Sequence, residues 1–194
     1  MGFSITWCAV REENADSFLQ QLGLTPTGET EEFPESLIST VALHTGWRVI
    51  WYNEYDCPFL RPQDLRELSK HTEVLLCLVE EHVMASSAEM WSNGKRKWWL
   101  SHEGEDGPSG IASEGELPQS FPAIRENLEQ AQLAAGGADA DVDYMFDIPL
   151  TMAVTLVGFR HDENIERLAD GHFIVLSRKG DVPAGSFLKR LFRK

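Results

Sequence analysis

Short apolar runs recur along the chain at strand length and predict a sheet. Residues 4–10 are typical of a first strand. Residues 37–43 and 47–52 flank His44-Thr45-Gly46, as expected for a short hairpin whose turn contains glycine. The continuous apolar run at residues 74–79 predicts a central strand that is buried on both faces.

The dipeptide Asn93-Gly94 is the strongest turn signal in the chain. A two-residue loop of this composition joins the strands of a β-hairpin, here within residues 87–102. The simplest register places Glu89 opposite Trp98. Because Trp98 and Trp99 are adjacent, they point to opposite faces, and we expect Trp98 to be the more exposed of the two.

Four stretches have helical spacing of apolar residues, and each begins at a capping residue or a proline. They cover residues 14–22, 62–70, 120–135 and 147–159. Composition indicates a loop at residues 25–36 and an acidic loop at residues 103–119. The pattern predicts a single α+β domain over residues 1–194, in which helices pack on one face of a mostly antiparallel sheet.

Charge is unevenly distributed. The chain has 31 acidic and 17 basic residues, a net charge of −14. Residues 103–143 contain ten acidic residues against one base, Arg125, whereas the last 17 residues contain six bases. This acidity disfavours direct binding to nucleic acid, because phosphates are repelled over most of the surface. The C-terminal segment, residues 183–194, is predicted to be a basic amphipathic tail.

The cysteine count and the apolar runs limit the compartment. Three cysteines without a C-x-x-C pair do not form a disulfide framework. No apolar run approaches the roughly 20 residues that a membrane span needs, and the N-terminus lacks the features of a secretory signal. We therefore expect a cytoplasmic protein that does not enter a membrane.

Histidines and carboxylates near two predicted strand ends form the best candidate for chemistry. Glu81 and His82 follow one strand, and His102 ends another. In the predicted hairpin register Ala85 lies opposite His102, so the two histidines are within reach. A small metal-dependent or general acid/base enzyme using His82, His102 and Glu81 is thus one alternative. No spacing closes a set of metal ligands, so neither a metal nor a cofactor is expected.

Two further motifs are incomplete. Residues 139–143 alternate aspartates as an EF-hand loop does, but Tyr144 and Leu150 stand where that loop needs glycine and glutamate. This favours a solvated acidic loop. Residues 160–163 contain a His-Asp pair that could act as a base with its orienting partner. Arg160 and His161 are instead expected to complement the C-terminal end of a helix.

The absence of a recognisable catalytic motif favours a protein that acts by binding. The leading hypothesis is a non-enzymatic module that binds a basic protein, in the manner of an immunity or antitoxin protein that inhibits a nuclease. A structural or assembly subunit that uses the basic tail is a further alternative. The residues expected to contact the partner are Trp98, Glu103, Glu105, Asp106, Glu114 and Glu116.

Overall fold

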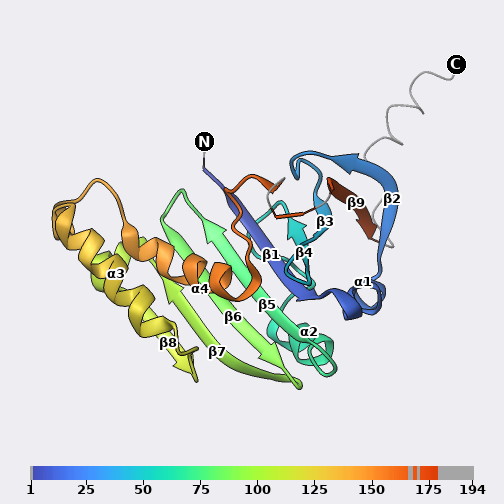
Figure 1. Ribbon diagram of the computed structural model, residues 1–194, viewed down its shortest axis with the longest axis horizontal. Helices are drawn as coiled ribbons and strands as arrows, with labels where there is room; N and C mark the ends of the chain where they lie inside the picture. Colours follow the sequence, from blue (N-terminus) through green and yellow to red (C-terminus); the bar gives the residue numbers. More distant parts are fainter. Residues whose placement is uncertain (1, 166–167, 170, 179–194) are drawn as a thin grey trace, which may run out of the picture.

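Nine antiparallel strands form one sheet in the computed structural model (Figure 1). The structure describes residues 2–165, 168, 169 and 171–178, so the predicted basic tail at residues 183–194 lies outside the described residues. Along the sheet the order is β2-β9-β3-β4-β1-β5-β6-β7-β8, so the last strand in sequence is inserted between the second and the third. The strands are β1 (Ser4–Arg11), β2 (Leu24–Glu31), β3 (Ile38–Ala42), β4 (Trp47–Tyr52), β5 (Glu73–Glu80), β6 (Ala85–Ser92), β7 (Lys95–His102), β8 (Ile111–Gly115) and β9 (Phe173–Arg178).

Helices connect the strands and lie close to where the sequence pattern predicts them. The α-helices are α1 (Ala15–Leu22), α2 (Pro62–Leu68), α3 (Phe121–Ala134) and α4 (Asp147–Val157), with short 3-10 turns at η1 (Glu12–Asn14), η2 (Gly104–Ser109), η3 (Gly137–Asp139) and η4 (Tyr144–Phe146). The predicted α+β class with a mostly antiparallel sheet is therefore confirmed. In the described part of the chain, no helix is both long enough and apolar enough to cross a bilayer.

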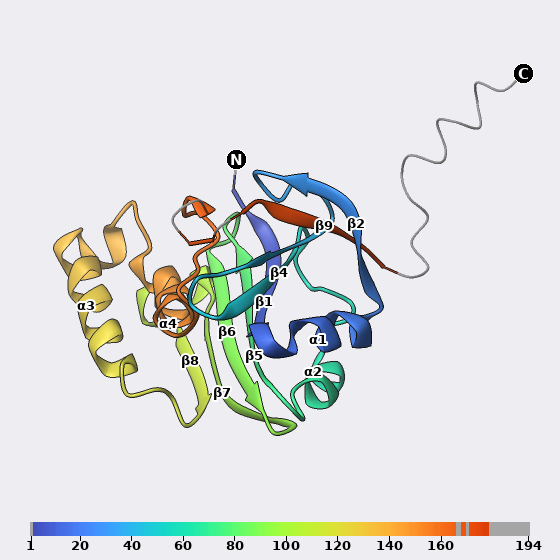
Figure 2. The same cartoon turned by 45° about the vertical axis from the view of Figure 1, so that its right-hand side comes forward.

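Helices cover both faces of the sheet, whereas the sequence pattern predicted helices on only one face. One apolar cluster joins α4 to β1, β4, β5 and β7, and α3 packs outside α4 (Figures 1 and 2). The other cluster joins α1 and α2 to the opposite face. Strand β5 shows why both faces need cover: Leu75 and Cys77 belong to the first cluster, and Val74 and Leu76 belong to the second.

Both edge strands lie where composition indicated loops. Strand β2 pairs only with β9 and has a bulge between Pro26 and Thr30, and nearly all of its side chains are exposed. Strand β8 pairs only with β7, and its side chains are also mostly exposed. An edge strand that buries neither face has no apolar alternation, so hydrophobic patterning could not reveal either one.

The β6–β7 hairpin turns at Asn93-Gly94 as predicted, but its register shifts by one residue. Lys97 is an additional residue on β7, and beyond this β-bulge Met90 pairs with Trp98 and Glu89 pairs with Trp99. Trp98 therefore points into the core and is only 4% exposed. The expectation that Trp98 is the exposed indole is wrong, because it assumed an uninterrupted ladder.

Candidate functional site

Acidic side chains gather at the β8 edge of the sheet. We define the acidic edge as the exposed residues Glu103, Glu105, Glu114 and Glu116. Glu114 lies on β8 and Glu116 follows it, whereas Glu103 follows β7 and Glu105 lies in η2, the turn that leads to β8. Glu114 forms an ion pair with Arg96 on β7. Within the described residues, the other three carboxylates have no ion-pair partner. The side chain of Asp106, the fifth acidic residue expected here, lies outside what the structure describes.

Trp99 is the indole that adjoins the acidic edge. It lies opposite Glu114 in the β7–β8 ladder. The guanidinium carbon of Arg96 is 5.8 Å from the centre of its ring, within the range of a cation–π contact. Trp98 was expected to be the indole beside the acidic residues, but the structure places Trp99 there.

A buried carboxyl group lies behind this edge. Glu89 is 8% exposed, and its Oε2 lies 3.4 Å from a guanidinium nitrogen of Arg96. Burial raises the pKa of Glu89, and the charge of Arg96 opposes that shift only in part. A cleft of about 260 Å³ adjoins Glu89 and Trp99. Thr6 also lines this cleft, and its buried hydroxyl has no hydrogen-bond partner among the described residues. Arg96 thus connects a buried acid to an exposed one, Glu114.

The histidines of the enzyme alternative do not converge on a common site. His82 is exposed at the β5–β6 turn, and its Nδ1 lies 2.7 Å from Glu80 Oε1. His102 is buried, with Nε2 2.8 Å from Asp143 Oδ2 and Nδ1 3.1 Å from the carbonyl oxygen of Gly110. Both nitrogens of His102 are occupied, so neither is available to a ligand. Among the described residues, no group of three side chains is arranged to hold a metal ion.

Asp143 has a structural role that the EF-hand comparison did not anticipate. Its Oδ1 accepts hydrogen bonds from the backbone N–H groups of Met145 and Phe146, at 3.0 and 3.4 Å. It therefore caps η4 while its other oxygen contacts His102. This carboxylate fixes the entry to α4.

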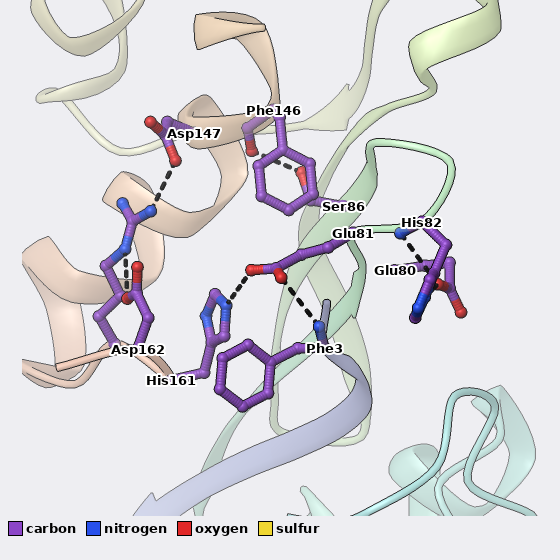
Figure 3. A network of polar contacts seen from close by, with 10 residues as sticks. Phe3, Glu80, Glu81, His82, Ser86, Phe146, Asp147, His161 and Asp162 are labelled. Carbon is purple, nitrogen blue, oxygen red and sulfur yellow. Dashed lines mark hydrogen bonds and ion pairs between the residues drawn. The ribbon is translucent and has the colours of Figure 1, made fainter. Parts of the chain in front are cut away.

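His161, which follows α4, pairs with Glu81 at the β5–β6 turn (Figure 3). Its Nε2 lies 3.2 Å from Glu81 Oε1, and Glu81 Oε2 accepts the backbone N–H of Phe3 at 2.8 Å. A carboxylate only accepts hydrogen bonds, so Nε2 carries the proton of this bond. Within the part of the chain that the structure describes, that arrangement leaves the buried Nδ1 without a partner. Eighty residues separate the two side chains, so no local spacing could have predicted the pair.

Arg160, the residue before His161, contacts the first residue of α4. It donates to Asp147 Oδ1 and to Asp162 Oδ1, each at 2.7 Å. The expected contact of Arg160 and His161 with a helix C-terminus is replaced by these carboxylate pairs. They hold the segment after α4 against the helix and against the β5–β6 turn.

No family model, curated protein or solved structure matches this chain. The assignment of function therefore depends on the side chains described above. They form two separate groups: the acidic edge with Trp99, and the carboxylate pairs of Arg160 and His161.

Proposed function

We propose that the protein is a non-enzymatic binding module for a basic protein, with the acidic edge as its contact surface. The observation that carries the proposal is the position of the exposed Glu114 on a terminal strand of the sheet, with three further exposed glutamates in the segments that precede and follow that strand. Its specific form is an inhibitor of a basic protein such as a nuclease, comparable to an immunity or antitoxin protein. The carboxylates would occupy the lysines and arginines with which a nuclease holds phosphate.

The backbone of β8 supports this proposal. A terminal strand has one row of N–H and C=O groups that face away from the sheet, and an extended segment of a partner can add to such a row. A second copy of the same acidic strand is repelled by like charge, whereas a basic segment is attracted. The edge is therefore suited to a partner of opposite charge.

Trp99 and Arg96 favour a defined contact over a diffuse electrostatic one. The indole offers a large and rigid surface beside the carboxylates, the kind of residue that dominates binding energy at interfaces. A basic side chain that pairs with Glu114 displaces Arg96 from it, and Arg96 can then pair with Glu89 alone.

Capture from native lysate, at low and high salt, tests this function. The edge variant changes Glu103, Glu105, Glu114 and Glu116 to Gln. The matched control changes four exposed glutamates far from β8 to Gln, so that both variants lose the same charge: Glu13, Glu29, Glu32 and Glu35.

We expect the wild type and the control to retain a basic protein at low salt and the edge variant to lose it. Exposed charges are screened beyond about 8 Å at physiological salt, so high salt should weaken capture by the wild type. If the edge variant retains the same partner at both salts, or if the control loses it equally, the acidic edge is not the contact surface.

A further inference from the structure

An indole flanked by two carboxylates lies across three neighbouring strands. Glu89 on β6 pairs with Trp99 on β7, and Trp99 pairs with Glu114 on β8. Residues that lie directly opposite one another in a ladder project from the same face of the sheet. Figure 1 shows these three strands side by side at one end of the sheet. We call the three side chains the Glu–Trp–Glu row.

The bulge at Lys97 places Arg96 over this row. In a regular strand, residues three positions apart project from opposite faces. Because Lys97 is an additional residue, Arg96 and Trp99 share one face instead, and the guanidinium carbon of Arg96 lies 5.8 Å from the centre of the indole ring. One terminal nitrogen of the guanidinium pairs with Glu114, and the other lies 3.4 Å from Glu89 Oε2. The row is therefore a guanidinium site that the chain's own arginine fills.

The chemistry of the row favours a guanidinium over an ammonium group. A guanidinium is planar, so it can lie on the face of an indole and present two parallel N–H groups to a carboxylate at its edge. An ammonium group is compact and strongly hydrated, and it offers neither geometry. An arginine side chain can therefore contact Trp99 and Glu114 with one flat group.

The place that Arg96 holds is open to a partner. The side chain of Glu114 is 69% exposed and that of Arg96 is 33% exposed, and Trp99 is half-buried. Glu89 is the most enclosed of the four residues, with 10% of its side chain exposed. A guanidinium that approaches over the terminal strand β8 therefore meets Glu114 and the indole before it meets Glu89.

The cleft beside Arg96 gives this side chain space to move aside. It has a volume of about 260 Å³ and adjoins Glu89 and Trp99 as well. The charged residues of its lining are two acids and two bases: Asp56, Glu89, Arg61 and Arg96. Their formal charges balance, so the cleft as a whole does not repel a guanidinium. It thus offers Arg96 a place to which it can turn while Glu89 remains its partner.

We propose that Trp99 and Glu114 form an arginine-binding site, whose place Arg96 holds in the free protein and yields to an arginine of the basic partner. Glu89 retains Arg96 after the exchange, so neither guanidinium is left without a carboxylate. The inference rests on the proposed function and deepens it, because it names the side chain that the acidic edge recognises. It also makes Arg96 an internal competitor, which a partner must replace before it binds.

A titration of the full chain observed by ¹⁵N NMR tests this site without the partner. The probes are N-acetyl-L-arginine amide and N-acetyl-L-lysine amide, which carry the same charge, at constant ionic strength. The signal to follow is the indole N–H resonance of Trp99, which is identified by its loss in Trp99→Phe. Arg96→Ala empties the site, and Arg96→Gln, which keeps the apolar stem, serves if the Ala variant does not fold. Arg125→Ala is the matched control, because it removes an exposed arginine that pairs with Glu129 on α3.

We expect the arginine probe to shift the Trp99 resonance and to bind Arg96→Ala about tenfold more tightly than the wild type, because it no longer has to displace a charged hydrogen bond. The lysine probe should bind this variant about tenfold more weakly than the arginine probe does. Adding Glu114→Gln to Arg96→Ala should bring the affinity for the arginine probe down to that for the lysine probe. Arg125→Ala should bind both probes as the wild type does.

Any of four results would overturn the proposal: no shift of the Trp99 resonance in the Arg96 variants with millimolar arginine probe, equal affinity for the two probes, equal affinity of the wild type and the Arg96 variants, or no effect of Glu114→Gln. In each of these cases the acidic edge can still capture a basic protein through its other glutamates. Failure of the arginine site and failure of the proposed function can therefore be distinguished.

Discussion

At the scale of single residues, Glu89 makes stability depend on pH in a defined direction. Its pKa is raised by burial, so the folded protein holds this proton to higher pH than the unfolded chain does. The wild type therefore loses stability as pH rises through the interval between the unfolded and folded pKa values of Glu89. Below that interval Glu89 is protonated in both states and no stability is lost. Above it Glu89 is ionised in both states and the loss of stability is complete.

The Glu89→Gln variant isolates this effect, because Gln does not titrate. We expect the stability of the wild type relative to Glu89→Gln to fall as pH is raised from about 4 to 7, measured by urea unfolding of both proteins at each pH. A difference that is constant over this range, or that changes in the opposite direction, would contradict the raised pKa.

The three cysteines give a second prediction at this scale. Burial raises the pKa of Cys57 to about 12, and it also raises the pKa values of Cys8 and Cys77. The thiolate is the reactive form, so the native protein should react with a disulfide reagent at mildly alkaline pH far more slowly than a free thiol. Unfolding in guanidinium should release three reactive thiols. Rapid modification of one thiol in the native protein would contradict the burial of that cysteine.

At the scale of secondary-structure elements, strand β8 depends on Gly115. This residue has a φ of +84°, and a Cβ at its position would lie 2.2 Å from the carbonyl oxygen of Lys97, the additional residue of the β7 bulge. Backbone carbonyls cannot move away as a flexible side chain does. The pairing of β8 with β7 therefore requires glycine here.

Gly115→Ala should destabilise the protein by about 2 kcal/mol or more, since it adds steric overlap to an unfavourable backbone conformation. The matched control is Gly107→Ala, which has a φ of +68° but no atom within 4 Å of the added methyl group. Urea unfolding gives the stabilities, and hydrogen exchange of the β8 amides shows whether the loss is local. Equal effects of the two substitutions would mean that the contact with Lys97 does not limit the strand.

Elements that bury apolar side chains could be predicted from the sequence, and the exposed ones could not. The central strand at residues 74–79 and the turn at Asn93-Gly94 follow from burial and from turn chemistry. The edge strands β2 and β8 bury almost nothing, and the Lys97 bulge leaves no local signal. The bulge at Lys97 buries Trp98 and leaves Trp99 as the more exposed indole. This one additional residue therefore replaces Trp98 by Trp99 in the expected contact surface.

The candidate sites were predictable to different degrees. The acidic residues at 103–116 were found because charge along a segment is visible in the sequence. The pair formed by Glu81 and His161 depends on the packing of the segment after α4 against the β5–β6 turn, which joins parts of the chain that are far apart. Local spacing instead suggested His82 and His102, which have other partners, Glu80 and Asp143.

At the scale of the whole molecule, the acidic edge lies at one end of the sheet. It borders β8, whereas β2 and β9 lie at the other end. Figures 1 and 2 show these strands far apart. A protein partner can therefore occupy the edge without covering β2 and β9.

Net charge and its position predict the kinetics of partner binding. The association rate constant of the captured partner should fall roughly tenfold or more as salt is raised from low to high concentration, because long-range attraction is screened. Trp99→Ala should mainly increase the dissociation rate constant, since the indole acts only after contact. Stopped-flow binding at several salt concentrations measures both. An association rate that does not depend on salt would argue against electrostatic attraction by the acidic edge.

Hydrogen exchange of the complex tests the central claim most directly. The captured partner is bound to the full chain, and exchange at each amide is compared with that of the free protein. The account predicts that new protection concentrates in β8 and the adjoining residues 103–116, with little change in β2 and β9 at the other end of the sheet. Protection confined to other parts of the molecule, with the β8 amides exchanging as in the free protein, would contradict it.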